Sequence, residues 1–225
     1  MRTTPSGERA LRTPRAAGLA GVVFALLFAA AIVLIRIGIP EGVEAATAAG
    51  RTDSARRNAV HTALALVPFA GIFFLWFAGV VRSHLGEAED RFLATVFLGS
   101  GLVFVATMFG AAAAAAAVLD IVHTPGSTAG LRTWDFGSHF AYTLMTGYAM
   151  RMAAVFICSL SVLGHRRGVL PRWLTLLGFL ATLVLLFVSS NVPWAELAFP
   201  AWSLVLSGYI LVVTDRPRPS VTAPT

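Results

Sequence analysis

The sequence predicts an all-α fold, a polytopic membrane helix bundle of six transmembrane helices with the N- and C-termini in the cytoplasm. Of its 225 residues, 57% are hydrophobic and only 12% are charged, whereas soluble domains carry about 25% charged residues. Apolar runs of about 20 residues, long enough to cross a hydrocarbon core of about 30 Å, follow one another along the chain. Together these runs leave no room for a soluble domain with its own core.

The first span is predicted at residues 17–39, after a polar segment at 1–16 that we expect to be a disordered cytoplasmic tail. A cleaved signal peptide is the alternative, because basic residues precede the run and Ala46-Thr47-Ala48 resembles a cleavage site. The hydrophobic region of a signal peptide spans about 7–15 residues. The longer run here favours a retained transmembrane helix.

The second and third spans are predicted at residues 58–81 and 92–119. Pro68 predicts a kink in the second span. The third span contains an unbroken run of alanines from Ala111 to Ala117. Small residues let a neighbouring helix backbone approach closely, so this run indicates a packing face. A cofactor groove beside the alanines is the alternative.

The fourth span is predicted at residues 136–164, with Asp135 as its N-cap and Arg151 near its middle. An arginine at the centre of a membrane helix costs roughly 2.5–3.5 kcal/mol on insertion scales. Its side chain is too short to reach the polar segment that begins at His165. We therefore expect Arg151 to face a partner inside the bundle or a water-filled cavity.

The last two spans are predicted at residues 170–189 and 194–214, and a tight turn joins them. Pro200 interrupts the last span near its start. Either the helix kinks there, or residues 194–199 lie at the membrane interface and a shorter helix begins at Pro200. The Pro-rich segment at 215–225 is predicted to be a disordered cytoplasmic tail, so the transmembrane domain covers residues 17–214.

The distribution of arginine gives the orientation of these six helices. All 17 basic residues are arginines, and eleven of them flank the ends that the topology places in the cytoplasm. This positive-inside bias predicts a multi-pass protein of the bacterial inner (plasma) membrane. Because the arginines lie in short segments beside apolar runs, the sequence argues against nucleic acid as a partner. The lone Cys158 excludes an internal disulfide.

Polar side chains on the outer half of the fourth span predict a ligand-binding site. Tyr142, Thr143 and Thr146 follow His139 at helical spacing and extend toward the depth of Arg151. They are candidates for one wall of a polar cavity with the arginine at its floor. The predicted ligand-binding residues are Arg151, Tyr148, His139, Tyr142 and Thr146.

Several ligands fit a buried arginine. They are a lipid phosphate, another anion, and an acidic residue of a partner membrane protein or of a second copy of the chain. Hydrogen bonding between helices is the purely structural alternative, because Thr and Tyr commonly link membrane helices in this way. We expect a non-enzymatic module that binds membrane lipids, an anion or a partner chain, without a cofactor.

A small membrane enzyme with a site on the outer face is the alternative function. Histidines and carboxylates gather at the outer ends of the predicted helices, where they are candidates for a divalent metal site or for acid–base catalysis. These candidate ligands are His61, His123, His139, Asp120 and Glu196. The sequence contains no HExxH, P-loop, dinucleotide-binding or GxSxG motif. A secondary transporter is the third hypothesis, although we see no internal repeat and no carboxylate within a span.

The last two spans carry a resemblance to a known group of proteins. Leu170-Pro171-Arg172-Trp173-Leu174 and Gly178, followed by Pro200-Ala201-Trp202 and Gly208, resemble the C-terminal half of bacterial six-helix integral membrane proteins of unknown function, common in actinobacteria. The resemblance implies the same six-helix topology and a plasma-membrane location. It implies no activity and no catalytic residue.

Overall fold

The computed structural model describes residues 14–39, 54–85, 91–121, 128–189, 192 and 194–214, and this part of the chain is helical almost throughout. The predicted tails lie outside it, apart from residues 14–16, which begin the first helix. The elements, in chain order, are α2 (Pro14–Gly38), α4 (Ser54–Leu85), α5 (Arg91–Ile121), α6 (Thr128–Tyr142), the π-helix η1 (Thr143–Ala149), α7 (Met150–Arg166), α8 (Arg172–Leu183), the π-helix η2 (Val184–Val188), the 3₁₀-helix η3 (Ala195–Leu197) and α9 (Ala198–Thr214).

Five of the helical segments are long and apolar enough to cross a membrane. They are Arg15–Gly38, Ser54–Arg82, Phe92–Ala117, Trp134–Arg166 and Ala195–Val213. The apolar helix at Arg172–Val188 is shorter, and at 1.5 Å per residue it measures only about 25 Å. The structure therefore confirms an all-helical protein with several membrane-length helices, of which five rather than six reach full length in the described residues.

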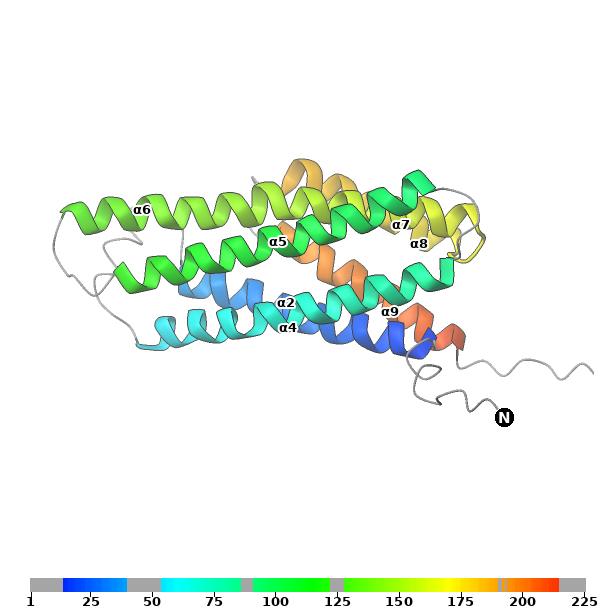
Figure 1. The fold of residues 1–225 in the computed structure, drawn as a ribbon, viewed down its shortest axis with the longest axis horizontal. Helices are drawn as coiled ribbons and strands as arrows, with labels where there is room; N and C mark the ends of the chain where they lie inside the picture. Colours follow the sequence, from blue (N-terminus) through cyan, green and yellow to red (C-terminus); the bar gives the residue numbers. More distant parts are fainter. Residues whose placement is uncertain are drawn as a thin grey trace, which may run out of the picture.

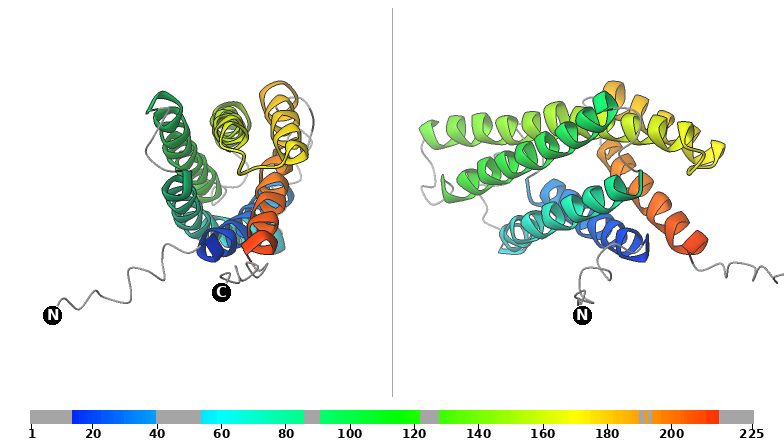
Figure 2. Two further views of the ribbon diagram at one scale, coloured as in Figure 1. Left: turned by 90° about the vertical axis from the view of Figure 1, so that its right-hand side faces the viewer. Right: turned by 45° about the vertical axis from the view of Figure 1, so that its right-hand side comes forward.

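Consecutive helices run antiparallel, except that α6, η1 and α7 form one continuous helix, and together they close into a ring (Figure 1). α2 packs on α4, α4 on α5, α5 on α6 and α7, α7 on α8, and α8 on α9, which returns to pack on α2. The end-on view of Figure 2 shows α6 and α7 between α5 and α8. α2 begins and α9 ends at the same end of the bundle, which we call the α2-start end.

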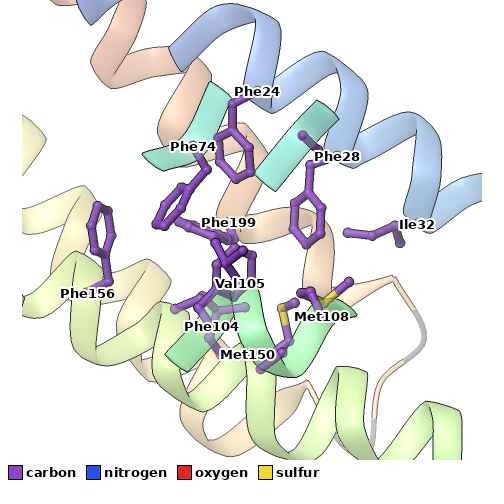
Figure 3. Packing of buried hydrophobic residues seen from close by; sticks show 14 of the residues in the cluster. Phe24, Phe28, Ile32, Phe74, Phe104, Val105, Met108, Met150, Phe156 and Phe199 are labelled. Carbon is purple, nitrogen blue, oxygen red and sulfur yellow. The ribbon is translucent and has the colours of Figure 1, made fainter. Parts of the chain in front are cut away.

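Phenylalanines fill the centre of this ring. The buried rings come from five helices, and their centroids lie 4.9–6.5 Å apart in mostly edge-to-face pairs (Figure 3). Such pairs contribute about 0.5–1.5 kcal/mol each beyond the area they bury. The rings belong to Phe24 and Phe28 of α2, Phe74 of α4, Phe104 of α5, Phe156 of α7 and Phe199 of α9.

The fourth predicted span is one long helix that begins earlier than expected. α6 starts at Thr128, shortly after the turn-forming dipeptide Pro125-Gly126 in the sequence. Asp135 therefore lies inside the helix, and the prediction that it caps the helix is wrong. The helix passes through η1 into α7 without a break and ends at Arg166.

The turn from α7 to α8 follows directly from the local sequence. Gly168 has φ +65, which is the left-handed conformation that terminates many helices and that glycine adopts without strain. Val169 and Leu170 donate their N–H groups to Gly164 O at 3.0 and 3.1 Å. Pro171 then precedes the first residue of α8 in extended conformation, so the chain reverses within a few residues.

The last helix also begins abruptly. Trp194 adopts a left-handed φ of 72, the short helix η3 follows, and α9 starts at Ala198. Pro200 is the third residue of α9, where a missing N–H costs no intrahelical hydrogen bond. The helix that contains Pro200 starts at Ala198, and together with η3 it forms the membrane-length segment Ala195–Val213.

Candidate functional site

Arg151 is exposed on the outside of the bundle. It is the second residue of α7, and its Nη1 donates a hydrogen bond to Gly147 O of the preceding turn at 2.8 Å. The prediction that Arg151 faces the interior of this chain is therefore wrong. The face of α7 that carries Arg151 points away from the phenylalanine core. The opposite face, with the buried residues Ala153 and Phe156, packs against that core.

The π-helix η1 lies immediately before Arg151 and gathers side-chain hydrogen bonds onto its carbonyls. Thr146 donates to Tyr142 O at 3.0 Å, and Ser189 from the end of η2 donates to Thr146 O at 3.2 Å. With the bond from Arg151 to Gly147 O, two carbonyls of η1 and the last carbonyl of α6 accept hydrogen bonds from side chains. π-Helical turns are rare and occur frequently at functional sites, which makes this segment notable.

The other predicted ligand-binding residues do not share one wall. Tyr148 is 58% exposed and lies on the same face as Arg151. His139 is exposed and lies 3.6 Å from Asp135 of the same helix. Tyr142 is buried and turned toward the end of α2, whereas Thr146 is half-buried. Tyr148 and Arg151 therefore form an outer face, and Tyr142 belongs to a different site.

That second site is an ion pair between the end of α2 and η3. Arg36 in the last turn of α2 places Nη2 2.5 Å from Oε1 of Glu196 in η3. The side chain of Glu196 is fully buried and that of Arg36 is 11% exposed. Oε2 of Glu196 has no hydrogen-bond partner within the described residues.

Aromatic side chains enclose the guanidinium of Arg36. Its Cζ lies 5.5 Å from the ring centroid of Tyr142 and 5.9 Å from that of Trp194, which are cation–π distances. The hydroxyl of Tyr142 donates a short hydrogen bond to Ile39 O. The arrangement joins α2, α6 and η3 at the end of the bundle opposite the α2-start end.

Sequence reasoning missed this pair. The topology prediction left Arg36 outside the eleven arginines at the cytoplasmic ends, and Glu196 was only a candidate metal ligand. Both residues stand at the predicted outer end of an apolar span, Arg36 at the end of the first span and Glu196 at the start of the last. Opposite charges at the same depth were a usable signal, although nothing in the sequence places α2 beside α9.

The outer-face metal site remains untested as a function. The part of the chain that the structure describes holds no group of three or more His, Cys, Asp or Glu side chains close enough to bind a metal ion. Glu196 is engaged by Arg36, and His61 is exposed on α4. His123 and the side chain of Asp120 lie outside the described part.

Small residues line the exposed face of α5 beside the Arg151 face. At helical spacing, α5 exposes Ala106, Gly110, Ala113 and Ala117. A Cβ on Gly110 would lie 3.7 Å from Cδ1 of Leu144, a half-buried residue of η1, the segment that precedes Arg151. The alanine run thus packs inward through Ala111 and Ala115, and its other side is a smooth outer surface.

The structure thus describes two sites, the exposed face around Arg151 and the buried pair of Arg36 with Glu196. Both lie in membrane-length helices, and each contains an arginine whose surroundings the structure describes. The resemblance of the last two spans to six-helix bacterial membrane proteins stays a prediction. Comparison of the chain with protein-family models, curated proteins and solved structures gives no match.

Proposed function

We propose that this protein is a non-enzymatic, multi-pass component of the bacterial inner membrane that assembles with a partner membrane protein through Arg151. The observation that carries the proposal is the exposure of a guanidinium in the middle of a membrane-length apolar helix. Within the described residues, no carboxylate forms an ion pair with it. The partner supplies that carboxylate from a transmembrane helix of its own.

The hydrogen-bonding capacity of Arg151 supports an external partner. A guanidinium has five N–H donors, and the acceptor that the chain provides among the described residues is Gly147 O. Donors left facing hydrocarbon are costly, and charged groups within a membrane pair with one another for this reason. A carboxylate accepts two parallel hydrogen bonds from arginine, which makes it the best complement.

The depth of Arg151 favours a protein carboxylate over a lipid phosphate. Along the helix axis, Arg151 is about 14 Å from Tyr142 and about 22 Å from Arg166, at 1.5 Å per residue. Lipid phosphates lie outside a hydrocarbon core of about 30 Å. The arginine side chain is shorter than either distance, so a phosphate would reach it only if the bilayer deformed.

The exposed small residues of α5 give the partner helix a surface to lie on. Without a side chain beyond Cβ at Ala106, Gly110 and Ala113, a second helix can approach the α5 backbone closely, as small residues allow in membranes. We name Ala106, Gly110, Ala113, Leu144 and Arg151 the docking face. A helix along this face passes Leu144 and brings an acidic residue to the level of Arg151.

The proposed topology has six spans with both termini in the cytoplasm. The α2-start end of the bundle carries Arg82, Arg166, Arg167 and Arg172 near the helix ends, which supports its position on the cytoplasmic side. In this topology α8 and η2 together form the fifth span. A helix this short is accommodated by local thinning of the bilayer or by flanking residues that reach the interface.

Native mass spectrometry of the protein extracted gently from its own membrane tests the proposal. We expect wild type to carry a partner chain that Arg151→Leu loses, because leucine removes the charge but keeps the surface apolar. Gly110→Leu should weaken the same complex without touching the charge. Arg82→Leu, at the exposed end of α4, is the matched control and should keep the partner. Loss of an anionic lipid instead of a chain, or equal binding by all variants, would overturn the proposal.

A further inference from the structure

Four buried polar atoms in the half of the bundle nearer the α2-start end have no hydrogen-bond partner within the described residues. They are Ser161 Oγ of α7 and, on α9, Trp202 Nε1, Ser203 Oγ and Ser207 Oγ. Each of these side chains is at most 2% exposed. An unpaired polar group that is buried in this way costs about 1–3 kcal/mol, so four together call for an explanation.

Two of these atoms converge on Gly178 of α8. Ser161 Oγ lies 2.1 Å, and Trp202 Nε1 3.1 Å, from the point where a Cβ on Gly178 would stand. The two atoms can be no farther apart than the sum of these distances. A single water molecule that makes two hydrogen bonds of about 2.8 Å bridges up to about 5.6 Å, which is more than that sum.

The chemistry of the two groups defines what fits between them. An indole N–H is a donor only, whereas a serine hydroxyl both donates and accepts. Ser161, Ser203 and Ser207 can also turn to donate to a carbonyl of their own helix, but Trp202 has no such local acceptor. A molecule bound between them must therefore accept a hydrogen bond from the indole N–H and donate one to the serine hydroxyl. Water does both.

We propose that Ser161, Trp202 and Gly178 form a binding site for a buried water molecule that joins α7, α8 and α9. The water accepts from Trp202 Nε1 and donates to Ser161 Oγ. Ser203 and Ser207 are one turn apart farther along α9, and Ser207 Oγ lies 2.1 Å from the Cβ position of Gly21 of α2. Buried waters of this kind make about three hydrogen bonds and stabilise otherwise unpaired groups.

Nuclear magnetic resonance of the full-length protein in lipid nanodiscs, with ¹⁵N-labelled tryptophan, tests the site. The chain has five tryptophans, and the spectrum of Trp202→Phe identifies the indole signal of Trp202. In wild type we expect this N–H to exchange slowly with solvent and to show a cross-peak to a long-lived water. Absence of that cross-peak in the wild-type protein would contradict the proposal, regardless of the results for the variants.

Two serine variants then locate the water. Ser161→Ala removes the acceptor, so the cross-peak should disappear while the indole signal remains. Ser159→Ala removes a buried hydroxyl of the same helix that is 4% exposed, and it should leave the cross-peak unchanged. A direct hydrogen bond between Ser161 and Trp202 would shift the indole signal in Ser161→Ala without any water cross-peak in wild type. That result, or a cross-peak that survives in Ser161→Ala, contradicts the assignment.

Discussion

Arg36 lies at the end of α2 and Arg151 near the middle of the fourth helix, and both helices are apolar and of membrane length. The charges of these two arginines have different surroundings. Arg36 pairs with a fully buried carboxylate of the same chain, Glu196, and lies between two aromatic rings. Arg151 contacts its own backbone and remains exposed. The first arrangement joins two distant segments of this chain, whereas the second leaves the charge on the outside of the bundle, where we propose that a partner binds.

At the residue scale, the Arg36–Glu196 pair gives a direct stability prediction. Glu196→Ala leaves the guanidinium partly buried without its carboxylate, and removing one partner of a buried pair costs about 3–5 kcal/mol. We expect a clearly lower midpoint of thermal unfolding in detergent. Asp135→Ala removes the carboxylate of the exposed pair with His139 and should cost less than about 1 kcal/mol. Equal losses for the two variants would show that the buried pair contributes no special stability.

At the scale of elements, the contact between α2 and α9 depends on the absence of side chains. A Cβ on Gly21 would lie 2.1 Å from Ser207 Oγ and 2.8 Å from Cδ2 of Phe77. A Cβ on Gly18 would lie 2.6 Å from Cγ of Leu211. Both glycines therefore let the two helices approach, as small residues do in membrane helix pairs.

Gly21→Ala is accordingly expected to push α9 away from α2. Overpacking of a well-filled core costs typically about 1–3 kcal/mol, and the unfolding midpoint in detergent should fall. Gly79→Ala is the matched control, because a Cβ there meets nothing within 4 Å and alanine favours the helix over glycine by up to about 1 kcal/mol. A Gly21→Ala protein as stable as Gly79→Ala would show that the α2–α9 contact adapts without strain.

The polar stripe predicted on the outer half of the fourth helix does not form one wall. His139 is exposed and Tyr142 is buried, although both belong to α6 and precede η1. Tyr148 within η1 and Arg151 after it are exposed. Which of these side chains is buried depends on the helices that pack on each turn, and spacing along a single helix does not give it.

At the scale of the whole molecule, the topology can be tested with single cysteines in a Cys158→Ser background. We expect a membrane-impermeant maleimide to label His61→Cys and Val192→Cys on intact spheroplasts. Arg167→Cys, in the turn between α7 and α8, should react only after permeabilisation. All three wild-type side chains are exposed, so accessibility within the protein does not limit labelling.

The pair Arg167→Cys and Val192→Cys decides whether the short helix crosses the membrane. The segment Arg172–Val188 lies between them. If it spans, the two positions react from opposite sides. Reaction of both from the same side would leave five spans and place the two termini on opposite sides.

Hydropathy and turn residues predicted most of the fold. The helices of the structure include the predicted spans at 17–39, 58–81 and 92–119 to within a few residues at each end, because long apolar runs are a local property of the chain. The start at Thr128 was missed because the first turns of α6 are polar and were assigned to a loop. The shortness of α8 with η2 was also missed, since its apolar run continues to Ser189.

The sequence by itself determined that the chain is helical, that its helices are long and apolar enough for a membrane, and that arginines stand both within and at the ends of the spans. Only the tertiary structure decided where each charge points. Glu196 reaches Arg36 across 160 residues of sequence, and Arg151 faces outward because α5 and α8 pack on other sides of its helix. Hydropathy averages over all faces of a helix, whereas the rotation of that helix depends on its neighbours.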